Sequence, residues 1–335
     1  MKNKFFTLAV ISGMIFLTHC AAQDDYPVLE GEYLGQSPPG LEAELFAPGI
    51  MSTEMPELNA VFFPGGKEVI GSVTIGSMKW AMLMLREVNR RWTKPEIAPF
   101  SGRHGGVDPF VTADGKRIYF CSNRPRSGSG EPEEDYDIWY VDRTETGWSD
   151  PVNMGPPINS DTHEFYPSLT EDGTFYFQSR REGGLGASDI WKAELVDGKY
   201  VEAVPLPEPI NSPDFEGDAF IAPDESYIIV STVRAEKNFG GPDLYISFRS
   251  SAGTWGPLIN MGKSVNSDSG ENCQMLSPCG RYLFLTSRRT KDRGLDFPLS
   301  YEAIQKTWNS PQNGLGDIYW VDARIIDQLK EQIQK

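Results

Sequence analysis

The chain has 335 residues, of which 39% are hydrophobic, and its 47 acidic against 31 basic side chains give a formal net charge of −16. Such an acidic chain lacks the long-range attraction that nucleic acids and anionic membranes require, so we expect neither as a ligand. Four cysteines and three histidines are too few for a disulfide framework or a zinc site built on histidine.

Residues 1–22 have the pattern of a secretory signal peptide, with two lysines, an apolar run over 5–18 and then small residues. The run is too short to span a bilayer comfortably. Residues 17–20 resemble a bacterial lipobox, although a histidine stands where that motif carries Gly, Ala or Ser. Lipid attachment at Cys20 and cleavage after Ala22 with free export are therefore two open alternatives. Both predict an exported protein, either a periplasmic or outer-membrane-associated lipoprotein or a secreted protein.

Residues 23–44 are interpreted as a linker, after which one pattern is repeated five times over 45–322. Each copy contains a strand, a hairpin turn of the Asp-Gly type, a second strand with alternating hydrophobicity, a third strand and a fourth strand signal. The turns lie 49, 58, 52 and 55 residues apart, at Gly66, Gly115, Gly173, Glu225 and Gly280. Four strands per repeat without a helical pattern predict an all-β, five-bladed β-propeller. A sixth, degenerate blade is the alternative.

The two ends of the repeat region predict how the propeller closes. The last copy ends after its third strand, at residues 317–323, and a short helix is expected over 323–335. Residues 42–53 resemble the fourth-strand segments of the other copies. We therefore expect the N-terminal segment to supply the outer strand of the last blade and to remove its open edge.

The repeated turns SPCG, TADG, TEDG and APDE are followed by FCSNR, FQSRR or LTSRR and then by DIW, DLY or DIY. Over residues 45–322 this pattern resembles the WD40-like, TolB-type (PD40) propeller repeat of bacterial envelope proteins. The resemblance implies the propeller fold. It leaves the function open, because the family includes binding platforms as well as domains attached to peptidases and lyases.

Charged side chains recur at two positions that a propeller places at the mouth of its central channel. Acids precede or open the first strands at Glu57, Glu164, Glu216 and Glu271, and basic residues follow the second strands at Arg124, Arg180, Arg234 and Arg288. This register predicts carboxylates near the axis with guanidinium groups close behind. Either each Glu and Arg pair stabilises its own blade, or together they form a polar funnel for a sugar, a peptide end or a metal.

The last copy departs from the repeat through an insertion at residues 290–316, which carries Tyr301 and Trp308. Long loops inside a compact domain are usually functional or disordered. We expect this insertion over the channel face, where its aromatic rings would suit a carbohydrate or a peptide. The alternative is that the insertion is an ordinary surface loop without a binding role.

Two functional hypotheses follow. The first is a monomeric, non-enzymatic module of the cell envelope that binds a protein, peptide or glycan, favoured by the absence of a nucleophile motif such as G-x-S-x-G.

The second is a carbohydrate-active hydrolase or lyase, with Glu164, Glu216 and Glu271 as candidate acids and bases. Their equivalence in the repeat argues against it, because a catalytic pair needs two different environments. No catalytic residue and no cofactor is assigned, and a channel-bound cation such as calcium stays open. Membrane contact is expected only through a lipid anchor.

Overall fold

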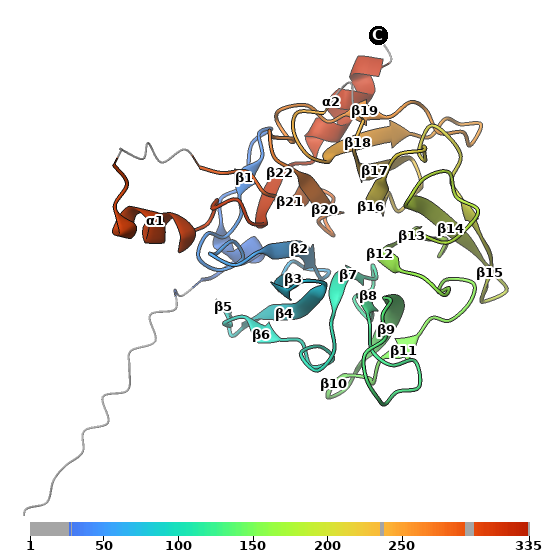
Figure 1. The fold of residues 1–335 in the computed structure, drawn as a ribbon, viewed down its shortest axis with the longest axis horizontal. Helices are drawn as coiled ribbons and strands as arrows, with labels where there is room; N and C mark the ends of the chain where they lie inside the picture. The colour runs from blue at the N-terminus through green and yellow to red at the C-terminus, as the bar shows by residue number, and fades with distance from the viewer. Residues whose placement is uncertain (1–26, 28, 235–237, 292–297, 334–335) are drawn as a thin grey trace, which may run out of the picture.

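The computed structural model describes residues 27, 29–234, 238–291 and 298–333, and Figure 1 shows them as antiparallel sheets arranged like blades around a central axis. There are five such sheets, so the predicted all-β, five-bladed propeller is confirmed. The segments predicted as signal peptide and lipid attachment site, including Cys20, lie outside the described residues. No described helix is long and apolar enough to cross a bilayer.

The blades follow one another in chain order. Blade one contains β2 (Glu57–Phe62), β3 (Glu68–Gly76), β4 (Lys79–Val88), β5 (Arg91–Trp92) and β6 (Glu96–Ile97). Blade two contains β7 (Val107–Val111), β8 (Arg117–Ser122), β9 (Asp137–Thr144), β10 (Gly147–Trp148) and β11 (Val152–Asn153). Blade three contains β12 (Glu164–Leu169), β13 (Phe175–Ser179), β14 (Asp189–Val196) and β15 (Lys199–Pro205).

Blade four contains β16 (Glu216–Ile221), β17 (Tyr227–Thr232), β18 (Asp243–Phe248) and β19 (Ile259–Asn260). Blade five contains β20 (Glu271–Leu276), β21 (Tyr282–Ser287), β22 (Asp317–Asp322) and β1 (Glu44–Leu45). The remaining elements are the 3-10 turn η1 (Glu32–Gly35) and the helices α1 (Tyr301–Trp308) and α2 (Arg324–Ile333).

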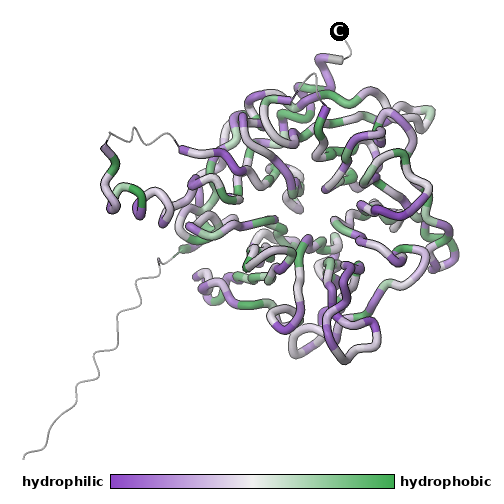
Figure 2. The backbone as a smooth tube through the Cα atoms, in the orientation of Figure 1, coloured by the Kyte–Doolittle hydropathy of each residue, from purple (hydrophilic) through white to green (hydrophobic). Residues whose placement is uncertain are grey.

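The core of the molecule lies between neighbouring blades. The middle strands are buried along almost their whole length because both of their faces pack on hydrophobic side chains. The third residue of each D-I/L-W/Y motif packs there as well, and these residues are 1–4% exposed: Trp139, Trp191, Tyr245 and Tyr319. Long hydrophilic stretches lie mainly in the outer loops (Figure 2).

The N-terminal segment closes the ring as the sequence predicts. Strand β1 pairs antiparallel with β22, with Glu44 opposite Trp320. Beyond β1, the Ser52 hydroxyl accepts from the Ile318 amide and donates to the Ile318 carbonyl, each over 3.0 Å. Phe46 is fully buried, and its ring centroid lies 4.9 Å from that of Trp320. The closure therefore combines backbone pairing with aromatic packing, and β1 covers the outer edge of β22.

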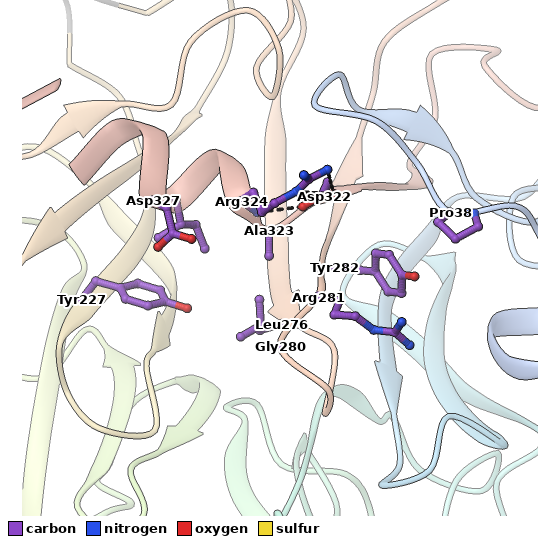
Figure 3. Close-up of a pocket in the computed structure, with 11 residues that line it drawn as sticks. Pro38, Tyr227, Leu276, Gly280, Arg281, Tyr282, Asp322, Ala323, Arg324 and Asp327 are labelled. Atoms are coloured by element: carbon purple, nitrogen blue, oxygen red, sulfur yellow. Dashed lines mark hydrogen bonds and ion pairs between the residues drawn. The ribbon is translucent and has the colours of Figure 1, made fainter. Parts of the chain in front are cut away.

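Helix α2 packs beside the hairpin turns of blades four and five, near Tyr227 and Gly280. Its residues Ile325, Ile326 and Leu329 join the main hydrophobic core. A cavity of about 510 Å³ lies beside the helix, where Arg324 pairs with Asp322 (Figure 3). Arg281, on its wall, contacts Glu32 and Cys279. The two guanidinium groups on the wall of this cavity, those of Arg281 and Arg324, are thus already bonded to acceptors of this chain.

Replacement of Phe46 by alanine tests whether closure stabilises the whole ring. Loss of a fully buried phenylalanine should lower the free energy of unfolding by about 3–5 kcal/mol. Phe239→Ala is the control, because that ring is 39% exposed, and its loss should cost less than about 1 kcal/mol. Urea denaturation of both variants gives the comparison, and equal losses would contradict this account of closure.

Candidate functional site

A cavity of about 720 Å³ lies on the propeller axis and is lined by residues from all five blades. It lies on the face where the first strands begin and the second strands end, opposite the hairpin turns. Its polar lining includes Asp108, Asp218, Gln178, Arg180 and Arg288. The side chains of Trp80, Phe165 and Phe215 form apolar parts of the wall. We take this channel cavity as the candidate site.

One position in every inner strand has a left-handed backbone, with φ between 47° and 63°, and we call its five residues the axial ring: Asn59, Asp108, Tyr166, Asp218 and Cys273. A bulge follows this residue in each blade and shifts the register with the second strand. Tyrosine and cysteine rarely adopt such a backbone, so the fold imposes it at this position.

The axial ring holds two acids that the sequence analysis did not select. Asp108 is 7% exposed, and its carboxylate lies 3.5 Å from the Asn59 amide nitrogen. Asp218 accepts from the Cys273 backbone amide over 3.2 Å. The only sequence signal for them is that the other copies carry Asn, Tyr or Cys at this position, so the acids are not part of the repeat.

The two aspartates have unequal environments. Burial raises the pKa of Asp108 well above its usual range, and the nearby charge of Asp218 raises it further. Burial also raises the pKa of Asp218, but hydrogen bonds from Cys273 and Asn272 and the positive charge of Arg288 oppose that rise. Without a further positive charge, Asp218 is therefore the more readily ionised of the two.

Two arginines stand at the mouth of the cavity. Arg180 and Arg288 directly follow the second strands of blades three and five. Their guanidinium groups have no hydrogen-bond or ion-pair partner among the residues that the structure describes. Beside Arg180, the His163 ring stacks on Phe165 with centroids 5.6 Å apart, and burial together with the Arg180 charge lowers the pKa of His163. The mouth thus combines free positive charge with aromatic surface.

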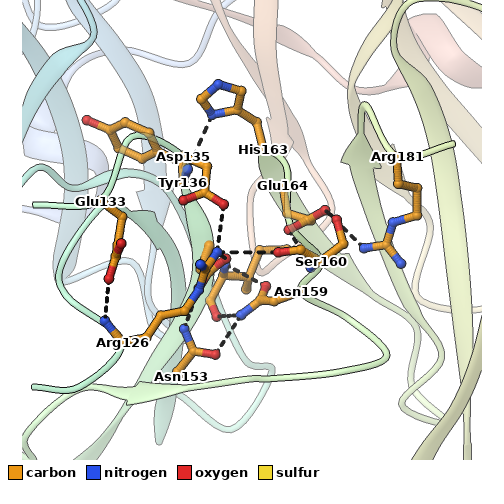
Figure 4. Close-up of polar contacts among 12 residues, drawn as sticks. Arg126, Glu133, Asp135, Tyr136, Asn153, Asn159, Ser160, His163, Glu164 and Arg181 are labelled. Atoms are coloured by element: carbon orange, nitrogen blue, oxygen red, sulfur yellow. Dashed lines mark hydrogen bonds and ion pairs between the residues drawn. The ribbon is translucent and has the colours of Figure 1, made fainter.

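Of the four repeated glutamates only Glu271 lines the cavity, and its carboxylate is bonded within its own blade. The predicted register of carboxylates around the axis is corrected here. Glu57 is 6% exposed, and the other three are fully buried: Glu164, Glu216 and Glu271. Each of these three accepts from the backbone amide and the hydroxyl of a serine four residues earlier, as Figure 4 shows for Ser160 and Glu164. A hydroxyl from the end of the second strand also donates to each: Ser179, Thr232 and Ser287.

The arginine partners of these glutamates differ from the predicted ones in two of three blades. Arg181 lies 3.1 Å from Glu164 and Arg289 lies 3.4 Å from Glu271, whereas the prediction chose the preceding Arg180 and Arg288. Successive residues of an extended chain point in opposite directions, so only the second residue after the serine faces the glutamate. Arg234, correctly placed, lies 3.0 Å from Glu216. These ion pairs stabilise the blades. The arginines one position earlier, Arg180 and Arg288, line the channel cavity instead.

Blades one and two each lack one member of this network. Gly106 stands where the other copies have an acid, so Arg124 keeps the bond to a connecting-segment carbonyl, that of Phe100, but has no carboxylate partner, and burial lowers its pKa to about 10. Glu57 has no arginine partner among the described residues and accepts hydrogen bonds from Thr53. Burial raises the pKa of Glu57 to about 8, despite those hydrogen bonds.

The insertion does not cover the channel in the way the sequence analysis expected. Among the described residues of the insertion, only Gly314, Leu315 and Gly316 line the cavity. Helix α1 stands outside the ring of blades (Figure 1), with Tyr301 70% and Trp308 55% exposed. The short loop between α1 and β22 reaches the mouth, while the helix itself projects outward.

No protein-family model and no curated protein matches this sequence. Solved structures with limited similarity to this chain include the following three. One is a protein provisionally named TolB from Agrobacterium tumefaciens, with a TM-score of 0.46 and 16% identity over 80% of this chain and 90% of that one. Another is an alpha-L-arabinofuranosidase from Lactobacillus brevis, with a TM-score of 0.47 and 10% identity over 81% and 91% of the two chains.

A third is the catalytic domain of a GH62 alpha-L-arabinofuranosidase from Coprinopsis cinerea, with a TM-score of 0.46 and 9% identity over 85% and 97% of the two chains. Identities this low, with TM-scores below 0.5, assign no function to this chain. Fold and site together define a five-bladed β-propeller with a charged cavity on its axis, a class that serves unrelated functions.

The pKa of Glu57 predicts a pH dependence of stability. Its folded value is about 8 and its ordinary value about 4.5, so its stabilising contribution is complete below pH 4.5 and is lost as the pH rises toward 8. In that window it should lower the free energy of unfolding by about 1.4 kcal/mol per pH unit. Glu57→Gln should remove this slope.

Urea midpoints measured at several pH values provide the test, with the exposed neighbour Glu54→Gln as control. The control variant should keep the wild-type slope. An unchanged slope in Glu57→Gln would show that Glu57 ionises freely in the folded protein.

Proposed function

We propose that the protein is an exported TolB-type propeller of the cell envelope that works as a binding module. Its channel cavity would capture a ligand through a carboxylate group, supplied by an acidic glycan or by the free C-terminus of a peptide. The observation that carries this proposal is the pair of unpartnered guanidinium groups of Arg180 and Arg288 at the cavity mouth.

Other exposed arginines, such as Arg91, also lack a partner among the described residues, so what distinguishes Arg180 and Arg288 is their place on the wall of the cavity. The neighbouring Arg181 and Arg289 do find carboxylates. A guanidinium group presents two parallel N–H donors that match a carboxylate, and this geometry is specific as well as strong. Arg180 and Arg288 are therefore suited to an anionic group that comes from outside the chain.

The shape and the apolar wall of the cavity limit the ligand. A volume of about 720 Å³ is typical of sites for small molecules and accommodates one or two sugar rings or the end of a peptide. Trp80 and Phe165 offer flat apolar surface to the face of a sugar or to an aliphatic side chain. The proposed ligand therefore combines one negative group with an apolar face.

Calorimetric titration with matched ligand pairs tests the proposal. Uronate oligosaccharides are compared with their neutral counterparts, and peptides with a free C-terminus are compared with their amides. We expect the anionic member of at least one pair to bind at least about tenfold more tightly, since charged hydrogen bonds contribute about 1.5–3 kcal/mol. Equal affinity within both pairs would contradict the proposal.

Variants identify the groups responsible. Arg180→Gln and Arg288→Gln should each weaken binding of the anionic ligand about tenfold. Arg91→Gln, an exposed arginine on the outer edge of blade one, should have no effect and serves as the control for net charge. An equal loss in all three variants would indicate unspecific attraction.

A second candidate function is a carbohydrate-active enzyme, and the unequal environments of Asp108 and Asp218 favour it. Acid and base roles need carboxyl groups of different proton affinity, and Glu164 and Glu216 are fully buried and absent from the cavity wall. Incubation with a polysaccharide panel, scored for new reducing or unsaturated ends, tests this function. Turnover that is lost in Asp218→Asn but kept in Arg91→Gln would replace the binding-only proposal.

A further inference from the structure

We propose that blade one contains a second binding site, a small pocket beside Glu57 that binds a guanidinium group from outside the chain. In blades three, four and five, an arginine of the same blade is the ion-pair partner of the corresponding glutamate. Blade one has no such arginine but has the acceptors that would bind one. The proposal does not depend on the anionic ligand of the channel cavity, because the two cavities share no lining residue.

The strand register shows which donors blade one lacks. Val73 lies opposite Glu57. The other glutamates have a hydroxyl residue opposite them: Ser179, Thr232 and Ser287. In those blades the arginine follows two residues later, and in blade one this position is Ile75, which is 67% exposed. Among the described residues, only Thr53 donates to the Glu57 side chain. Glu57 therefore lacks both a hydroxyl donor and a guanidinium donor.

The carbonyl groups that bind the arginine in other blades have counterparts in blade one. The repeated arginines donate to the carbonyl of the residue six positions before the glutamate position: Phe100, Ile158, Ile210 and Val265. Arg181 and Arg234 also donate to the carbonyl before it. The same positions in blade one are Met51 and Ile50, whose carbonyls accept no hydrogen bond from the described residues. One carboxylate and two carbonyls thus form a set of acceptors without a guanidinium donor.

A cavity of about 190 Å³ lies beside these acceptors. In blade three the Arg181 guanidinium carbon lies 4.9 Å and 5.2 Å from the ring centroids of Phe177 and Trp191. In the strand register Gly71 corresponds to Phe177, and Leu83 corresponds to Trp191. Blade one therefore lacks both rings as well as the arginine. The cavity is lined by Gly71 and Leu83 together with the residues that carry the acceptors: Ile50, Met51 and Glu57.

The size and chemistry of the pocket fit a guanidinium group with an alkyl stem. A guanidinium group presents five N–H donors in fixed directions and can bond a carboxylate and carbonyl groups at once, whereas an ammonium is a compact point charge. A single water occupies only about 30 Å³. Leu85 and Pro95 add apolar surface to the wall, which suits methylene groups. Met55, which also lines the pocket, is 42% exposed, so a ligand can enter from solvent.

The charge of the pocket supports a cationic ligand. Burial raises the pKa of Glu57 to about 8, the hydrogen bonds from Thr53 oppose that rise, and the nearby charge of Asp317 adds to it. In blade three the charge of Arg181 opposes the rise that burial causes in the pKa of Glu164. A bound guanidinium would have the same effect on Glu57, so binding near pH 7 should release a proton.

Calorimetric titration of the wild-type protein with ethylguanidinium tests the site, with ethylurea as the neutral ligand of the same shape. We expect one ethylguanidinium per chain, bound at least about tenfold more tightly than ethylurea, because the hydrogen bonds are charged on both sides. Ethylammonium should also bind more weakly than ethylguanidinium. Titration in two buffers of different ionisation enthalpy should reveal the released proton. Absence of ethylguanidinium binding, or equal affinity for ethylurea, would overturn the proposal.

Variants place the ligand in this pocket. Glu57→Gln preserves the shape of the pocket and should weaken ethylguanidinium binding at least about tenfold. Leu83→Trp introduces the ring that Trp139 and Trp191 provide in other blades and should abolish binding by filling the cavity. The exposed neighbour variant Glu54→Gln should bind as the wild type does. If Leu83→Trp fails to fold, Glu57→Gln still decides, and undiminished binding in that variant would overturn the assignment.

A comparison of two ligands identifies the source of the guanidinium group. N-acetylarginine amide carries the peptide groups that flank an arginine of a partner protein, and ethylguanidinium does not. Tighter binding of the amide would assign the pocket to an arginine side chain, and tighter binding of ethylguanidinium would assign it to a free small molecule. Both results support a guanidinium site.

The outcome is separable from the function proposed for the channel cavity. Ethylguanidinium is titrated without any carboxylate ligand, and Arg180→Gln and Arg288→Gln should retain its binding. Asp218→Asn should retain it as well, because Asp218 lines the channel cavity and is absent from the pocket beside Glu57. Binding that is lost in Asp218→Asn but kept in Glu57→Gln would overturn the proposal and place the cation in the channel.

Discussion

The ring depends on one hydrogen-bonded network that is complete at three of the five blade junctions and partial at the other two. In the junction between blades two and three, the Asn159 side chain accepts from the Ile138 amide over 2.8 Å and donates to the Ile138 carbonyl over 2.9 Å. The next residue, Ser160, bonds Glu164 of the following blade, and Arg181 returns to the connecting segment through the Pro157 carbonyl. The third strand of one blade and the first strand of the next are thereby fixed by consecutive residues.

The same arrangement recurs at Asn211 and Asn266, and Ser52 performs the task of the asparagine where the ring closes. A buried ion pair is weak evidence for net stability, but removal of one partner leaves an uncompensated charge and is costly. The network thus fixes the orientation of each blade. It also occupies the carboxylates of the repeated glutamates with hydrogen bonds and ion pairs inside the junctions, so these repeated residues stabilise the fold.

Departures from the repeat create the site. Asp108 and Asp218 occur in two of the five inner strands, and Arg180 and Arg288 occur beside the repeated arginines in two of the blades. None of these four is needed by the junctions. Because the departures fall in different blades, the cavity has one arrangement of charges and no five-fold symmetry. It therefore suits a single asymmetric ligand.

The sequence predicted blade number and closure because turn spacing and strand alternation are local signals that tertiary packing does not change. It did not distinguish Arg180 from Arg181, since two adjacent arginines satisfy the same pattern. The second copy shows which of the two positions is the repeated one, because in Ser122, Asn123 and Arg124 only the residue two positions after the serine is basic. The sequence did not predict Asp108 and Asp218 as cavity residues, because each lies in a bulge with a left-handed backbone. Such a bulge breaks the strand alternation from which the direction of a side chain is inferred.

The cavity also connects binding with the integrity of the ring. Its lining comes from every blade, so it forms only when β1 has paired with β22 and blade five has met blade one. An open chain lacks the site, and any ligand or ion that binds the closed form stabilises closure by mass action. Both aspartates and both arginines line the same cavity. Because burial raises the pKa of Asp108 and of Asp218, the two carboxyl groups repel an entering anion less than two fully ionised ones would, and the arginines are left to orient it.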